Sequence, residues 1–118
     1  MTTLLKHEQS DAKVRDPIVF AQLNTSVELS CDSNGLPLQL CFWEQRLDRQ
    51  SRVINIGDDA SQSDGNTSAV GFAKGTCALK IQAFAVNDTG PWFCTLITQN
   101  GGKFTGVVVL GELPFYNL

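Results

Sequence analysis

Four cysteines in a chain of 118 residues constrain the fold more than any other feature. They are Cys31, Cys41, Cys77 and Cys94. An even number in a small chain is typical of disulfides formed in an oxidising compartment. The alternatives are a zinc site and free buried thiols, but no two of these cysteines form the C-x-x-C pair that favours zinc. We therefore expect two structural disulfides and an extracellular location.

Three Asn-x-Ser/Thr sequons agree with an extracellular location. They begin at Asn24, Asn66 and Asn87, and each is a predicted site of N-glycosylation. Such triplets also arise by chance in chains rich in Ser and Thr. The segment from Met1 to Gln9 lacks the apolar stretch of a secretory signal, so we expect that a signal was removed and that Met1 was added for expression.

Composition and charge exclude several classes of function. With 9 Lys and Arg against 12 Asp and Glu, the net charge of -3 provides no basic stripe for nucleic acid. No apolar run reaches the roughly 18 residues of a membrane-spanning helix, so we expect any membrane attachment to lie outside this sequence. The single histidine, His7, leaves little for general-base or metal chemistry. The acidic stretch 58–64 lacks the ligand spacing of a calcium loop. We predict no enzymatic activity, no cofactor and no metal site.

The residue pattern predicts short strands separated by turns. The predicted strands are 14–23, 27–31, 38–45, 52–56, 77–81, 92–96 and 104–110. Several of them alternate apolar and polar residues, which is the two-residue period of a half-buried strand, and Pro17 marks a bend in an edge strand. Seven to nine such strands predict an all-β sandwich or barrel over residues 14–111. We expect residues 1–13 to be a flexible N-terminal segment and 112–118 to be a tail or interdomain linker.

One set of spaced residues resembles the immunoglobulin superfamily. Its members are Cys31, Trp43, Leu79-x-Ile81-x-x-Phe84 and Asp88-x-Gly90-x-Trp92-x-Cys94. The resemblance covers about residues 14 to 111 and implies a Greek-key sandwich of two sheets. It also implies a disulfide between Cys31 and Cys94 that packs beside a buried Trp43, and a corner shaped by Asp88 and Gly90.

The resemblance also implies how the other two cysteines pair. Cys41 lies two residues before Trp43, and Cys77 lies two residues before Leu79, so both sulfurs should face the interior. The family places these two strands in opposite sheets. A second disulfide, Cys41–Cys77, is therefore expected to bridge the sandwich beside the first.

The chain departs from the family pattern in three places. Trp92 stands where the family usually has a corner tyrosine, and an indole N–H is a substitute donor with a different reach. The usual arginine partner of Asp88 is missing, which leaves Lys74 or Arg52 for that role. The strand 103–110 lacks the Gly-x-Gly bulge of rearranging antigen receptors. We therefore expect a variable-like ectodomain, of the V-set or I-set type, and not an antibody or T-cell receptor chain.

Alternation along two neighbouring strands predicts an exposed sheet face. With Trp43 and Cys94 pointing inward, the outward residues are Phe42, Glu44, Arg46, Phe93, Thr95 and Ile97. Immunoglobulin-like receptors commonly pair through this face, and apolar anchors with a charged rim suit an interface. The alternative is that a neighbouring segment or a second domain covers these aromatic side chains.

These residues predict a function in recognition. We expect an extracellular recognition or adhesion module of a cell-surface receptor, which binds a protein partner or a second copy of itself through this face. The alternative is a soluble protein of humoral immunity that binds a glycan or a microbial ligand through its loops.

Overall fold

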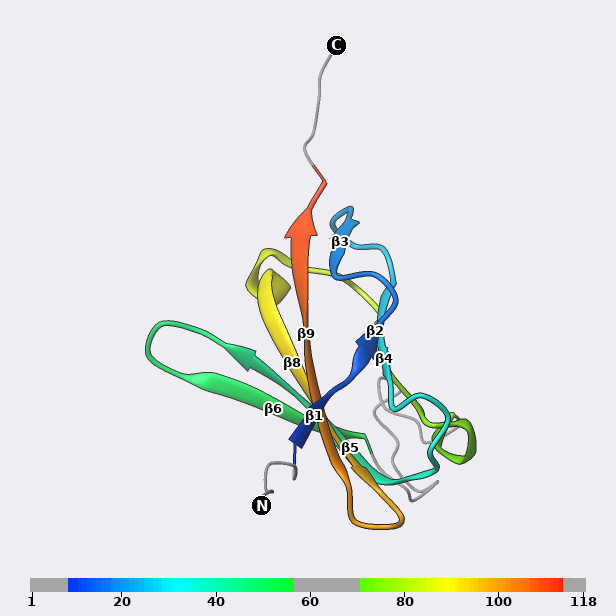
Figure 1. Cartoon of the computed structure of the whole chain (residues 1–118). Coiled ribbons are helices and arrows are strands. Elements are labelled where there is room, and N and C mark those ends of the chain that lie inside the picture. The colour runs from blue at the N-terminus through cyan, green and yellow to red at the C-terminus, as the bar shows by residue number, and fades with distance from the viewer. Residues whose placement is uncertain (1–8, 57–70, 114–118) are drawn as a thin grey trace.

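The computed structural model describes residues 9–56 and 71–113. Over these ranges the chain forms nine strands, two short 3-10 helices and no α-helix. The elements are β1 (Gln9–Asp11), β2 (Lys13–Val14), β3 (Ile18–Ala21), β4 (Val27–Asp32), β5 (Leu38–Arg46), β6 (Ser51–Ile56), η2 (Phe72–Lys74), β7 (Thr76–Ile81), η3 (Val86–Asp88), β8 (Gly90–Thr98) and β9 (Lys103–Glu112) (Figure 1). The predicted all-β class is confirmed.

The strands form two sheets with an immunoglobulin-like arrangement. One sheet has the order β1-β9-β8-β5-β6, with β3 also paired to β9, and the other has the order β2-β4-β7. The strands β1 and β3 run parallel to opposite ends of β9, and the other pairs are antiparallel. Strands distant in sequence are therefore neighbours in space, as the predicted Greek-key sandwich requires.

The ordered sheet begins earlier than the predicted boundary at residue 14. Residues 9–11 pair with the start of β9, and residues 13–14 cross to pair with the end of β4. Strands therefore occur within the segment 1–13 that is predicted from the sequence to be flexible, and residues 1–8 lie outside the described residues. These short edge strands are held through backbone hydrogen bonds, which a polar sequence without hydrophobic periodicity does not signal.

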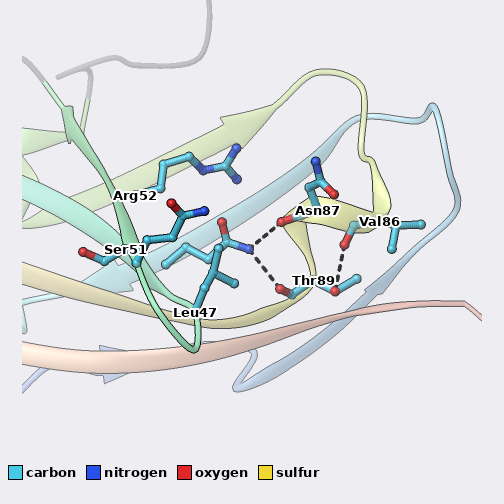
Figure 2. Close-up of a pocket in the computed structure, with 8 residues that line it drawn as sticks. Leu47, Ser51, Arg52, Val86, Asn87 and Thr89 are labelled. Carbon is cyan, nitrogen blue, oxygen red and sulfur yellow. Dashed lines mark hydrogen bonds between the residues drawn. The ribbon is translucent and has the colours of Figure 1, made fainter.

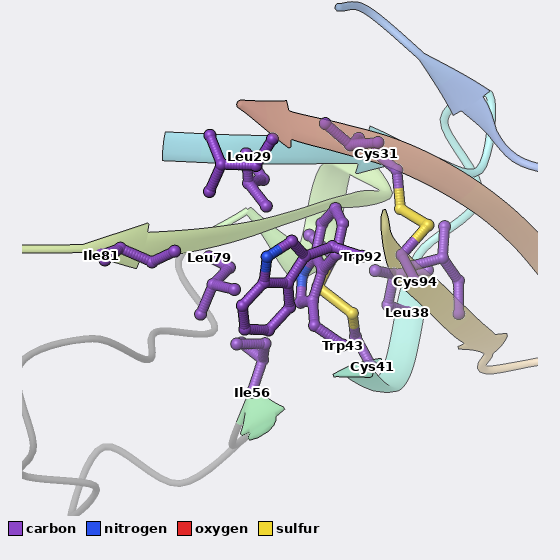
Figure 3. Packing of buried hydrophobic residues seen from close by; sticks show 14 of the residues in the cluster. Leu29, Cys31, Leu38, Cys41, Trp43, Ile56, Leu79, Ile81, Trp92 and Cys94 are labelled. Carbon is purple, nitrogen blue, oxygen red and sulfur yellow. A yellow bond between two sulfur atoms is a disulfide. The ribbon is translucent and has the colours of Figure 1, made fainter. Parts of the chain in front are cut away.

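Both predicted disulfides are present and both join the two sheets. Cys31 on β4 is bonded to Cys94 on β8, and Cys41 on β5 is bonded to Cys77 on β7, with Cα–Cα distances of 6.9 and 6.4 Å. Cys31 and Cys77 face each other in the register of β4 and β7. The two bridges therefore lie side by side in the core (Figure 3).

Large apolar side chains fill the space around the disulfides. Trp43, Leu79 and Trp92 are completely buried, and Trp43 lies opposite Cys94 in the pairing of β5 with β8 (Figure 3). Trp43 and Trp92 are the largest of the fully buried side chains, and burying apolar area stabilises a fold by about 25 cal/mol per Å². With the inward side chains fixed by this core, the alternate residues of β5 and β8 must point outward.

Candidate functional site

The outer face of the six-stranded sheet carries the six residues that the sequence places there. Phe42 lies opposite Thr95, and Glu44 lies opposite Phe93, in the register of β5 with β8. Of the six residues only Arg46 is exposed, and the other five are half-buried. The structure therefore brings the predicted set together on one surface, although the aromatic rings are partly covered by their neighbours.

Exposed aliphatic side chains extend this surface onto the neighbouring strands. Val53 on β6 lies opposite Glu44 and is 52% exposed, and Val107 on β9 lies opposite Phe93 and is 40% exposed. We refer to this surface as the outer face, defined by Leu40, Phe42, Glu44, Arg46, Val53, Phe93, Thr95, Ile97, Val107 and Val109. The valine run in the last strand predicts two outward side chains on β9. Sequence reasoning missed Val53, because the short strand around it was not assigned to a face.

Arg46 makes two contacts on the outer face. Its guanidinium carbon lies 3.9 Å from the centroid of the Phe93 ring, and its Nε lies 3.2 Å from Oε1 of Glu44. An exposed cation–π contact contributes about 0.5–1 kcal/mol, and an exposed ion pair contributes about 0–1 kcal/mol. Arg46 therefore covers Phe93 through contacts that are weak enough to be exchanged for others.

A second polar cluster lies at the turn that leads into β8. The carboxylate of Asp88 accepts hydrogen bonds from Nη2 of Arg52 at 2.6 Å and from the backbone N–H of Ala85 at 2.8 Å. The indole N–H of Trp92 donates to the backbone carbonyl of Asp88 at 2.9 Å. Asp88 therefore pairs with Arg52 and not with Lys74, the other cation that the sequence offered as its partner. The indole donor replaces the hydroxyl of the usual tyrosine.

The remaining motif residues have structural roles. Gly90 begins β8 with a φ of 117°, a conformation that other residues rarely adopt. The indole N–H of Trp43, unlike that of Trp92, has no hydrogen-bond partner among the described residues. Trp43 therefore acts by packing against the core.

Comparison with known proteins gives the family. The family model described as the immunoglobulin V-set domain matches residues 15–111. The chain belongs to the immunoglobulin V-set family. V-set domains are typically recognition domains without enzymatic activity, and in general they bind protein partners.

Solved structures agree with this V-set fold, whereas no curated protein matches the chain. A crystal structure of a chicken TCR superposes with a TM-score of 0.71 at 12% identity, over 91% of this chain and 57% of that chain. This V-set domain thus spans less than two thirds of the TCR chain. At 12% identity the similarity establishes a shared fold only.

The pairing of β8 with β9 is uninterrupted from Gly90 to Ile97, in agreement with the missing Gly-x-Gly motif. That the domain is not an antigen-receptor chain stays a prediction.

A pocket of about 550 Å³ separates the β5–β6 hairpin from the turn at η3 (Figure 2). It is lined by Gln45, Leu47, Gln50, Ser51, Arg52, Val86, Asn87 and Thr89. The buried amide of Gln45 donates to the backbone carbonyls of Asn87 at 2.7 Å and Thr89 at 2.9 Å, which fixes the turn against β5. Sequence reasoning missed this pocket, because its two walls are far apart in the chain.

The structure describes two of the three predicted glycosylation sites. Asn24 and Asn87 are both exposed, and Asn66 lies outside the described residues. The acidic stretch 58–64 and His7 also lie outside them. Within residues 9–56 and 71–113, no three His, Cys, Asp or Glu side chains are grouped to hold a metal ion. No helix in these ranges is long and apolar enough to cross a membrane.

Proposed function

We propose that this V-set domain is an extracellular recognition or adhesion module of a cell-surface receptor, and that it binds a protein partner through the outer face. The observation that supports this function is the apolar centre of that face. Phe42 and Phe93 are half-buried on adjacent strands. The exposed Val107 lies beside Phe93, and the exposed Val53 lies beside Glu44, so the two valines flank the Phe93–Glu44 pair. Aromatic anchors surrounded by aliphatic side chains are typical of the residues that dominate binding energy at interfaces.

The charges at this surface favour a second copy of the domain as the partner to test first. Glu44 and Arg46 lie next to each other, so the surface carries both signs of charge. A two-fold axis that passes between Glu44 and Arg46 would bring Arg46 of one copy near Glu44 of the other, as a self-complementary interface requires. Because the contacts of Arg46 within one copy are weak, little stability is lost when they are exchanged.

An extracellular location is supported by the cysteines. Both disulfides are buried in the core, and the structure leaves no free cysteine among the described residues. Such bridges form and persist in oxidising compartments. The exposed sequons at Asn24 and Asn87 also support an extracellular location.

The test is sedimentation of the domain over a range of concentrations, with Phe42→Asp and Phe93→Asp as variants. We expect self-association of the native sequence and its loss in both variants, because a buried unpaired carboxylate is costly at an interface. The control is Ala78→Asp, which adds the same charge to the outward side of β7 in the other sheet. Thermal unfolding must show that all three variants remain folded. Unchanged association of Phe42→Asp and Phe93→Asp would contradict the proposed site.

If the native domain sediments as a monomer, the native domain and the same variants are linked into multimers, and the binding of these multimers to cell surfaces is compared. Loss of binding in both variants, and not in Ala78→Asp, would support a different protein partner at the same face. Ligand binding that is lost when the turn 99–102 is exchanged, and kept in Phe42→Asp, would favour the humoral recognition protein instead. That turn is tight, since the N–H of Gly102 donates to Oγ1 of Thr98 at 2.8 Å, and it offers a small contact surface.

A further inference from the structure

We propose that the first sugars of an N-linked glycan on Asn87 occupy the pocket between the β5–β6 hairpin and η3, and that this glycan stabilises the folded domain. The inference rests on the extracellular location proposed above. It does not depend on what the outer face binds. The ligand of the pocket is thus a covalent one, an N-acetylglucosamine attached to a residue of the pocket wall.

The position of Asn87 is the first support. Asn87 is exposed and belongs to the pocket wall, so a sugar on its amide nitrogen starts at the pocket (Figure 2). The volume of about 550 Å³ lies within the range of about 300–1,000 Å³ that is usual for small-molecule sites. The open pocket therefore has enough volume for one or two sugar rings.

The chemistry of the wall suits an N-acetylated sugar. Val86 and Leu47 are apolar and are 57% and 41% exposed, and they offer aliphatic surface to the acetyl methyl group and to the C–H face of the ring. Gln50, Ser51 and Arg52 supply donors and acceptors for the sugar hydroxyls and the amide. A sugar in this place would cover aliphatic side chains that water otherwise contacts.

The attachment point is held rigidly. The Gln45 amide bonds the backbone carbonyl of Asn87 at 2.7 Å, the neighbouring Asp88 is paired with Arg52, and Oγ1 of Thr89 donates to the carbonyl of Val86 at 2.8 Å. A rigid attachment lowers the entropy that is lost when the first sugar is ordered. Contacts between glycan and pocket can then add to stability.

The second described sequon provides an internal comparison. Asn24 is exposed and stands near the same end of the sandwich, because its N–H donates to the carbonyl of Phe84 at 2.8 Å. It does not line this pocket. A glycan on Asn24 should therefore share the solvation effects of any surface sugar, but not the contacts with the pocket wall.

The experiment uses the domain secreted from glycosylating cells, with Asn87→Gln and Ser26→Ala as variants and Thr89→Ser as a control that keeps the Asn87 sequon. Ser26→Ala removes the Asn24 sequon and keeps Asn24 itself, whose φ of 67° lies in the left-handed region that glutamine adopts less readily than asparagine. Mass spectrometry before and after enzymatic deglycosylation measures occupancy at each site. With both sites occupied, Asn87→Gln should lower the midpoint of thermal unfolding by at least about 3 °C, and Ser26→Ala should change it by less than about 1 °C. Without glycans, Asn87→Gln and the native sequence should unfold at the same temperature.

A change in the wall tests the pocket itself. Leu47→Asp should remove the stabilisation that the Asn87 glycan gives, while leaving occupancy of Asn87 unchanged. Equal effects of the two glycans, or an Asn87 glycan whose effect survives Leu47→Asp, would overturn the inference.

Occupancy also separates this inference from the proposed function. Modification of Asn24 alone would overturn the inference and leave the extracellular location standing. Modification of neither site in secreted protein would overturn the inference and remove one support for that location. The Phe42→Asp variant should keep the full effect of the Asn87 glycan, and Asn87→Gln should keep self-association through the outer face.

Discussion

Arg52 and Asp88 tie the β5–β6 hairpin to the turn that leads into β8, with Nη2 of Arg52 at 2.6 Å from Oδ1 of Asp88. The side chain of Arg52 is 45% exposed and that of Asp88 is 10% exposed. The Asp88 carboxylate therefore depends more on hydrogen bonds from the protein than the Arg52 guanidinium does, because water reaches it less. The guanidinium carbon also lies 5.0 Å from the ring centroid of Trp92. One arginine on the edge strand β6 therefore supports the corner and also holds the hairpin that borders the outer face.

Replacing Arg52 by alanine should lower the free energy of unfolding by about 1–3 kcal/mol, because the nearly buried carboxylate of Asp88 loses its charged donor. Urea denaturation measures this change. The matched control is Arg15→Ala, which breaks the exposed pair with Asp16 and should change stability by less than about 0.5 kcal/mol. Similar effects of the two substitutions would show that Asp88 does not depend on Arg52.

Replacing Trp92 by phenylalanine should lower the free energy of unfolding by about 2–4 kcal/mol. The change leaves a cavity and removes the donor to the buried carbonyl of Asp88. Trp92→Tyr keeps a polar donor and should be less destabilising than Trp92→Phe. Equal destabilisation by the two variants in thermal or urea unfolding would mean that the lost volume of the indole, and not the hydrogen bond, governs this corner. A less stable Trp92→Tyr would mean that its hydroxyl is buried without a partner.

Removing the second disulfide as a pair, Cys41→Ala with Cys77→Ala, should cost about 3–4 kcal/mol, since the bridge closes a loop with a sequence separation of 36. The paired variant should still form Cys31–Cys94, which peptide mapping without reduction can confirm. A loss below about 1 kcal/mol would show that this bridge adds little beyond the packing of the core.

Replacing Gly106 by alanine should destabilise the domain by about 1–3 kcal/mol through overpacking. A methyl group there would meet Cγ2 of Val14 at 3.0 Å, Cβ of Ala12 at 3.2 Å and Sγ of Cys94 at 3.3 Å. Two of these three atoms belong to Ala12 and Val14, so the amide hydrogens at 12–14 should exchange faster, relative to those of β5, than in the native sequence. Unchanged exchange and stability would mean that β9 shifts to accommodate the methyl group.

Much of the core could be predicted from the sequence, because strand alternation is a local signal. The two-residue alternation around Cys41 and Trp43 predicts which side chains of β5 point inward, and the same alternation around Cys94 predicts the inward side chains of β8. Together with the family resemblance these parities predict both disulfides and the six outward residues of the outer face. The signal was absent in the polar segment 9–13, where the strands form through backbone pairing with β9 and β4 and through packing of Ala12 against the core.

The sequence by itself determined which side chains of β5 and β8 point inward and that an indole stands at the corner, and together with the family resemblance it predicted how the cysteines pair. Only the tertiary structure decided that Arg52 rather than Lys74 reaches Asp88, that Val53 joins the outer face and that Asn87 lines a pocket. The physical reason is the range of the interactions. Alternation acts between neighbouring residues, whereas the distance from Arg52 to Asp88, or from Leu47 to Asn87, depends on how strands far apart in the chain are ordered and paired.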